Sequence, residues 1–190
     1  MRNAQARRYA GATLLTPPIQ AMPTPDPQLA ALQSAAATLP VPQVHARLIW
    51  TAAVDVAERE SLGTSGLGER FIVPITGGAF WGAPGHEGLR GRIRAGGADR
   101  QLLRADGVKE LRAEYEMETD DGTVLTIDNR VIVDEAVQPE RYAMSRILVT
   151  APAGAHAWLN RRVFAGTLQS LRPGRQAVLV RGWLLESTAG

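Results

Sequence analysis

From Gln43 onward, apolar and polar residues alternate along the chain with a period of two. In the first such stretch every second residue is apolar, namely Val44, Ala46, Leu48, Trp50, Ala52, Val54 and Val56. This period places their side chains on one face of a β-strand. The alternation returns after each cluster of Gly, Pro or Asp residues, and it predicts further strands at about 69–75, 78–82, 88–94, 97–104, 111–118, 123–134, 143–150, 155–167 and 176–185.

These roughly ten short strands predict an all-β domain over residues 43–190. No amphipathic helix follows Gln43, which argues against a parallel sheet with helical crossovers. We therefore predict a single antiparallel up-and-down β-barrel of about 8–10 strands, broadly lipocalin-like, because closure removes exposed strand edges. Residues 1–42 are predicted to be a Pro/Ala-rich extension, disordered or partly helical, with a short helix in PQLAALQSAAATL.

Two glycine-rich stretches are predicted to shape the barrel. Gly77-Gly78, within VPITGGAFWG, allow a sharp reversal or a bulge where one strand bends into the next. Phe80 and Trp81 would then point to opposite faces, one of them into the barrel or across its mouth, where core packing and ligand stacking both stay open. The stretch GTSGLGE (63–69) does not lead into a helix, so we predict a flexible loop over one barrel mouth rather than a phosphate site.

Composition and charge exclude several classes of function. The chain has no cysteine, which excludes disulfides, thiolate zinc sites and a cysteine nucleophile. The net charge is only +2, and the arginines of LRGRIR (89–94) alternate with apolar residues, as on the solvated face of a strand, so nucleic acid is not an expected partner. No apolar run approaches the ~20 residues that span a bilayer, so no membrane association is expected.

Neither a metal nor a cofactor is expected from the motifs. His45, His86 and His156 are scattered without metal-ligand spacing, and the chain has no phosphate loop or dinucleotide fingerprint. Near the N-terminus, Arg7-Arg8 precede YAGATLLTPPIQA, as in a twin-arginine export signal, but the apolar core is short and Pro17-Pro18 interrupt it. We therefore expect a cytoplasmic protein, with a periplasmic location as the alternative.

Four motifs in a fixed order carry a family resemblance: RFIVPITGGAF, GGADRQLLRADG, YEMETDDGTVLTIDNR and HAWLNRRVFAGT. Over about residues 43–186 the chain resembles the DUF3237 (UPF0311) family of small bacterial and fungal β-barrel proteins. The resemblance implies a closed barrel without metal or nucleotide, and it implies no reaction, since the family is named for its lack of an assigned function. Arg100 replaces a residue that is usually aromatic in the family, and AMSRILVTAPAG replaces the usual strand, which affects any site built there.

Strand alternation selects the candidate site residues. Asn129 shares a face with the aliphatic Ile127 and Val131, and burying its amide without a partner costs about 1–3 kcal/mol. By the same alternation, Asp99 and Gln101 project to one side of their strand, and Tyr115 lies on the apolar face of the next one. In HAWLNRRVF, the predicted strand 155–167 places Trp158 and Asn160 on one face. We predict that these six residues meet in one cavity, if every strand assignment is in register.

Two readings of this polar interior stay open. It forms either a pocket for a small organic ligand or a satisfied network that fixes the register of the barrel. In the first reading Asp99 is the candidate general acid or base, and Asn129 and Asn160 hold a developing oxyanion. The protein would then be a cofactor-independent isomerase, lyase or cyclase, or a carrier. The rival is an interaction or structural module whose exposed arginine rows bind an acidic partner; a homo-oligomer stays open in both cases.

Overall fold

The computed structural model describes residues 26–188, which fall into two units divided after Pro40; each unit is described by itself. In the first unit, the short helix predicted in PQLAALQSAAATL is α1 (Pro27–Ala37). Asp26 caps it by accepting a hydrogen bond from the Gln28 amide (2.9 Å), and Pro27 starts it with a preset φ. No helix within residues 26–188 is long and apolar enough to cross a bilayer. Arg7-Arg8 lie outside the described residues.

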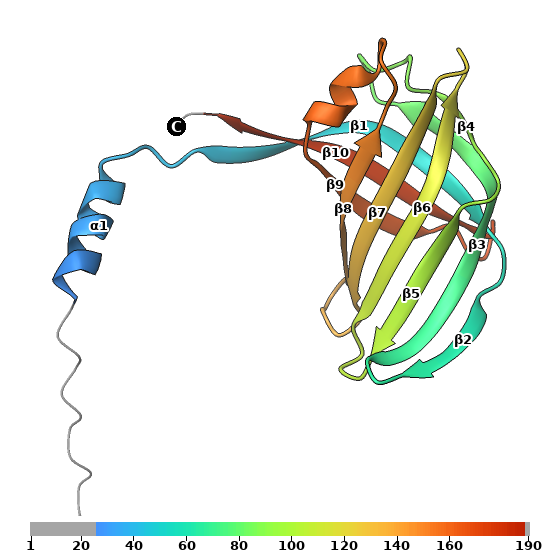
Figure 1. Ribbon diagram of the computed structural model, residues 1–190, viewed down its shortest axis with the longest axis horizontal. Helices are drawn as coiled ribbons and strands as arrows, with labels where there is room; N and C mark the ends of the chain where they lie inside the picture. The colour runs from blue at the N-terminus through green and yellow to red at the C-terminus, as the bar shows by residue number, and fades with distance from the viewer. Residues whose placement is uncertain (1–25, 189–190) are drawn as a thin grey trace, which may run out of the picture. The chain divides into compact units, whose positions relative to one another are not determined.

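The second unit consists of antiparallel β-strands and a short 3-10 helix (Figure 1). The strands are β1 (Gln43–Val56), β2 (Glu60–Ser65), β3 (Gly68–Gly82), β4 (Gly91–Ile93), β5 (Ala98–Arg104), β6 (Lys109–Thr119), β7 (Val124–Asp134), β8 (Tyr142–Thr150), β9 (Phe164–Ser170) and β10 (Ala177–Thr188). The 3-10 helix η1 (Ala157–Arg161) precedes β9.

The sheet closes into a barrel because β1 pairs with β10 along one edge and with β3 along the other. The remaining order around the wall is β10-β9-β8-β7-β6-β4-β3. β5 continues the position of β4 between β3 and β6, and β2 continues the line of β1 along β3. The predicted antiparallel β-barrel is therefore confirmed, with two of its wall positions each shared by two strands, β1 with β2 and β4 with β5.

The Gly77-Gly78 pair marks a bulge, not a break between strands. The predicted strands 69–75 and 78–82 are one continuous strand, β3, whose register against β1 shifts opposite Asp55 and Val56. At Gly78 (φ +135°) a Cβ atom would lie 2.1 Å from the carbonyl oxygen of Ala53, so only glycine fits this close approach. Phe80 is buried and Trp81 is 48% exposed, which confirms that they face opposite sides.

The prediction of a flexible loop at residues 63–69 is wrong. Ser65 and Gly68 pair across a two-residue turn, so the stretch belongs to the hairpin of β2 and β3. The serine hydroxyl accepts a hydrogen bond from the Leu67 amide (3.2 Å) and donates one to the Gly68 carbonyl (3.1 Å). Glycines that look like loop residues in sequence are here accommodated by a tight turn and an irregular strand.

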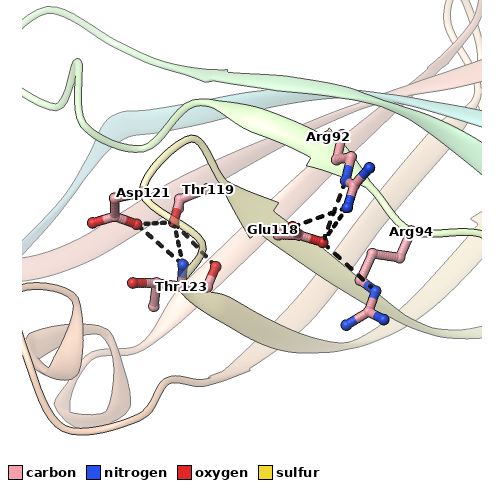
Figure 2. A network of polar contacts seen from close by, with 6 residues as sticks. All are labelled: Arg92, Arg94, Glu118, Thr119, Asp121 and Thr123. Carbon is pink, nitrogen blue, oxygen red and sulfur yellow. Dashed lines mark hydrogen bonds and ion pairs between the residues drawn. The ribbon is translucent and has the colours of Figure 1, made fainter.

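The TDDG motif forms the turn between β6 and β7, and its contacts are structural (Figure 2). The buried Thr119 hydroxyl accepts from the Thr123 amide (3.0 Å), and its single proton is shared between the Asp121 carboxylate and the Thr123 carbonyl (3.0 Å). On the outer side of the same strand, Glu118 binds Arg92 at 2.9 Å and lies 3.7 Å from Arg94. These contacts fix the hairpin and its pairing with β4.

One end of the barrel is filled by the hydrophobic core. Trp50 and Phe164 meet edge to face, with ring centroids 5.1 Å apart, and Phe80 and Leu159 are buried in the same cluster. Leu159 belongs to η1, the short orange helix at the upper end of the barrel in Figure 1. These large side chains fill the closed end, and the barrel interior has open space toward the end at which β6 begins.

Candidate functional site

A cavity of about 550 Å³ occupies the other end of the barrel. Its wall is mostly aliphatic, with Val73, Val131 and Val180 among the lining residues. Four of the six predicted site residues line it, namely Asp99, Gln101, Tyr115 and Asn129. An apolar cavity with a few polar groups is the usual form of a small-molecule site.

The pairing of β5, β6 and β7 brings the polar side chains together. Asp99 lies opposite Ala113, and Ala113 lies opposite Asn129, so a carboxyl and an amide flank a methyl group in one cross-strand row. Gln101 lies one row nearer the mouth, opposite Leu111, and Tyr115 lies one row deeper, opposite Ile127. Residues two apart share a face of a strand, so all four polar side chains project to the same interior.

Asp99 has an environment that favours its protonated form. Gln101 Nε2 donates to Asp99 Oδ2 (2.6 Å), while Oδ1 is shielded from solvent and has no hydrogen-bond partner among the described residues. Burial raises the pKa of the Asp99 carboxyl above its ordinary value of 3.8, and the hydrogen bond from Gln101 offsets only part of that effect. Asp99 is therefore a stronger base, when ionised, than a solvated aspartate.

Tyr115 and Asn129 supply two more polar groups that the described chain does not satisfy. Each residue is 1% exposed, and neither Tyr115 Oη nor Asn129 Oδ1 has a partner in residues 26–188. Burial raises the pKa of the Tyr115 phenol well above its usual value, so this group is a neutral donor. Each such buried group costs about 1–3 kcal/mol unless something in the cavity bonds to it.

Trp158 and Asn160 do not lie in this cavity, and the prediction that they would share it with Asp99 and Asn129 is wrong. Residues 157–161 form η1 instead of a strand, so counting every second residue gave the wrong faces. Asn160 Oδ1 accepts from the Ala151 amide and Asn160 Nδ2 donates to the Ala151 carbonyl, both at 2.8 Å. This pair of bonds fastens η1 to the end of β8.

Trp158 belongs to the closed end of the barrel. Its ring lies 5.6 Å from His86 and 6.3 Å from Phe164, measured between centroids. It packs against the buried core cluster. Its aromatic surface is thus used for packing at the end opposite the cavity mouth.

The mouth carries four cations that sequence reasoning missed, Arg59, Lys109, Arg141 and Arg172. Each lies at a strand end or in a connection, where alternation gives no direction, so no signal in the sequence identified them. Lys109 Nζ lies 2.9 Å and Arg141 Nη1 lies 3.3 Å from Glu135 Oε1. The Arg59 guanidinium lies 4.0 Å above the centre of the Phe71 ring.

The two departures from the family pattern fall outside the polar cluster. Arg100 lies opposite Arg112 on the outer face of the wall. AMSRILVT forms β8, where Ser145, Ile147 and Val149 are buried and Arg146 is exposed. Within residues 26–188, no group of three or more His, Cys, Asp or Glu side chains is arranged to hold a metal ion.

Comparison with known proteins gives a consistent family assignment. The family described as "Protein of unknown function (DUF3237)" matches residues 44–184. A UPF0311 protein of Rhodopseudomonas palustris is 36% identical over 88 residues, which are 46% of this chain and 55% of that protein. A UPF0311 protein of Bradyrhizobium diazoefficiens is 31% identical over 91 residues, or 48% and 57% of the two chains. The chain thus spans about half the length of the curated relatives it matches.

Solved structures share the fold over most of the chain. A conserved protein of unknown function from Rhodopseudomonas palustris has a TM-score of 0.68 at 28% identity, covering 77% of this chain and 100% of that one. A β-barrel-like protein from Acinetobacter baumannii has a TM-score of 0.67 at 28% identity, covering 77% and 98%. An enzyme from Penicillium herquei, at 20% identity, has a TM-score of 0.58 and covers 77% and 96%; this likeness shows the fold alone.

Proposed function

The chain belongs to the DUF3237 family, and from the cavity of its barrel we propose that it binds a small organic ligand and acts on it without a cofactor. One observation carries the proposal. Asp99 Oδ1, Tyr115 Oη and Asn129 Oδ1 come from three neighbouring strands, are shielded from solvent and have no partner within residues 26–188. A purely structural network would satisfy these groups, because each unmade hydrogen bond weakens the fold.

The chemistry that fits these groups is proton transfer. An ionised Asp99 removes a proton from a carbon or hydroxyl of the ligand, and its raised pKa makes it a suitable general base. The neutral phenol of Tyr115 donates a hydrogen bond to an oxygen on which negative charge develops. In an isomerase or a cyclase the proton then returns from Asp99 to another atom of the same ligand. In a lyase the bond to a leaving group breaks, and the proton goes from Asp99 to that leaving group.

Binding is tested before chemistry. A thermal-shift screen with hydrophobic and aromatic metabolites should find a stabilising ligand, since a ligand at 100 times its dissociation constant adds about 2.7 kcal/mol to the free energy of unfolding. The variant Ala113→Phe places a ring between Asp99 and Asn129 and should abolish the shift. Failure of the whole screen with the native protein would contradict the proposal.

Substitution of Asp99 then distinguishes an enzyme from a non-catalytic carrier. Asp99→Asn keeps the size of the side chain and removes its ability to accept a proton. An enzyme should lose turnover of the identified ligand by two or more orders of magnitude and keep its affinity, on the scale typical of acid–base catalysis (about 10²–10⁴-fold). A carrier has no turnover to lose, so unchanged affinity together with no detectable conversion by the native protein would assign carriage.

The rival function rests on a different observation. Arg100, Arg112, Arg130 and Arg146 form consecutive cross-strand pairs on the outer wall. Only Arg112 and Arg130 of this row have ion pairs within residues 26–188. Like charges placed opposite one another weaken a sheet, so this row favours an acidic binding partner. Capture of acidic peptides that is lost in Arg100→Gln/Arg146→Gln would support this module.

A further inference from the structure

The mouth of the cavity carries more positive than negative charge. Four segments far apart in sequence contribute one cation each: the connection after β1, the start of β6, the residue before β8 and the connection after β9. The cations are Arg59, Lys109, Arg141 and Arg172. Glu58 lines the same mouth, and Glu135 pairs with Lys109 and Arg141. Four cations therefore face two carboxylates.

The excess charge is concentrated on two arginines. Glu135 is shared by Lys109 and Arg141, and the hydrogen bond from Lys109 keeps the pKa of Glu135 low, so this group stays ionised. Glu58 accepts a hydrogen bond from Gln176 Nε2 (2.6 Å). In the part of the chain that the structure describes, neither Arg59 nor Arg172 has a carboxylate within 4.0 Å. Both side chains are exposed at the opening.

We propose that the ligand is an apolar molecule with an acidic group at one end, held by Arg59 and Arg172 at the cavity mouth while its other end reaches Asp99, Tyr115 and Asn129. This inference rests on the proposed ligand-binding function and names its substrate class. A guanidinium forms short, charge-assisted hydrogen bonds with carboxylate, sulfonate or phosphate oxygens. The aliphatic wall between the two ends accommodates the apolar part.

The geometry fixes the orientation and the length of such a ligand. Lys109 at the mouth and Ala113 in the polar row are four residues apart on β6, a separation of about 13 Å at the usual rise of a strand. The deep end disfavours an acidic group, because its poorly solvated space penalises a charged group of the ligand, as it penalises an ionised Asp99. The deep end accepts instead a neutral hydroxyl or carbonyl, which can bond to Tyr115 and Asn129. The ligand class is thus an aryl or long-chain acid with a distant neutral oxygen.

A pair of fluorescent probes tests the acid preference directly. 1-Anilinonaphthalene-8-sulfonate and N-phenyl-1-naphthylamine share one aromatic framework and differ in the sulfonate, and both brighten on entering an apolar cavity. The native protein should bind the sulfonate about tenfold more tightly than the neutral amine, on the scale of a charge-assisted hydrogen bond. Raising the salt concentration should narrow the difference, because the mouth is exposed and screening acts on it.

Matched variants locate the effect. Arg59→Gln/Arg172→Gln should remove the preference for the sulfonate and leave the affinity for the neutral amine within about twofold. Arg100→Gln/Arg146→Gln changes the net charge by the same amount on the outer wall and should leave both affinities unchanged. Ala113→Leu, with Ala113→Phe as a second filling variant, should weaken both probes if they occupy the cavity.

The outcomes separate this inference from the function on which it rests. Equal binding of the two probes, with loss of both in the Ala113 variants, would overturn the acid preference and leave the ligand-binding function standing. A preference that survives in Arg59→Gln/Arg172→Gln would also overturn it. Binding of neither probe by the folded native protein would contradict the ligand-binding function itself. Displacement of the neutral probe by 10-hydroxydecanoate, but not by 1,10-decanediol, would support the proposed class with a non-aromatic ligand.

Discussion

Asp99 and Asn129 face the same cavity from strands on either side of β6, with only the methyl group of Ala113 between them in the cross-strand row. Larger side chains at position 113 would separate the two polar groups. With alanine there, both can contact one ligand atom or neighbouring atoms of one ligand. Asp99 and Asn129 each carry a buried oxygen without a partner in residues 26–188, which lowers the stability of the fold. Such a loss of stability is typical of a binding site.

Asn129→Leu should stabilise the protein and weaken ligand binding. Leucine has nearly the shape of asparagine and removes the buried amide, whose unsatisfied oxygen costs about 1–3 kcal/mol. The free energy of unfolding, measured by urea denaturation, should therefore rise toward that amount. The matched control is Ile127→Val, an apolar truncation on the same face of β7, which should destabilise by about 0.5–1.5 kcal/mol. A loss of stability in Asn129→Leu would show that the amide is satisfied in the folded protein.

Asp99 should make the native protein lose stability as the pH rises. Burial raises the pKa of this carboxyl in the folded state, so the folded protein holds the proton more tightly than the unfolded chain. The stabilising effect is complete below the ordinary pKa of 3.8 and is lost as the pH rises through the folded-state value. Asp99→Asn cannot titrate, so its stability relative to the native protein should increase over that range, by about 1.4 kcal/mol for each unit by which the pKa is raised.

Denaturation curves at a series of pH values test this sign. The stability difference between Asp99→Asn and the native protein should grow from acid toward neutral pH. Asp128→Asn is a useful contrast, because Arg130 lowers the pKa of Asp128 and the sign of its contribution is opposite. A constant difference for Asp99→Asn across the series would show that the carboxyl has an ordinary pKa.

Thr119→Val should destabilise the hairpin between β6 and β7. The substitution keeps the shape of the side chain but removes the hydroxyl that bonds to the Thr123 amide and carbonyl and to Asp121 (Figure 2). Loss of these bonds in a buried position should lower the free energy of unfolding by about 1–3 kcal/mol. Thr126→Val, at a position whose hydroxyl has no hydrogen bond among the described residues, should change it by less than about 0.5 kcal/mol. Equal effects would mean that TDDG does not hold the turn.

The alternation of apolar and polar residues predicted the barrel and the inner faces of its regular strands. It succeeded for β5, β6 and β7 because a period of two is the geometry of an extended chain, and this placed Asp99, Tyr115 and Asn129 toward the interior. The Gly77-Gly78 pair separately predicted a sharp reversal or a bulge, and the structure has a bulge there. Where strand geometry holds, each residue's direction follows from its neighbours.

The same rule failed where the backbone leaves strand geometry. A 3-10 turn has three residues per turn, so Trp158 and Asn160 do not share the face that alternation assigns to them. The cations of the mouth were missed for a related reason. Arg59, Arg141 and Arg172 lie in connections, and only pairing between distant strands brings them to one opening. The polar residues of the interior could therefore be predicted from the local sequence, and the cations of the mouth could not.

Asn160→Ala should cost stability and leave ligand binding unchanged, whereas its predicted position in the cavity would require weaker ligand binding. Its amide replaces a strand partner for Ala151, accepting from the backbone N–H and donating to the carbonyl at 2.8 Å each. Alanine leaves both backbone groups to solvent or unsatisfied, so the free energy of unfolding should fall by about 1–3 kcal/mol. Asn160→Asp keeps the acceptor and loses the donor, so it should fall between the native protein and Asn160→Ala. The variants should bind N-phenyl-1-naphthylamine with an affinity within about twofold of the native value, because η1 lies at the closed end, away from the cavity. This affinity is measured well below the melting temperature of each variant. Weakened binding in a folded Asn160→Ala protein would show that the closed end contributes to the site after all.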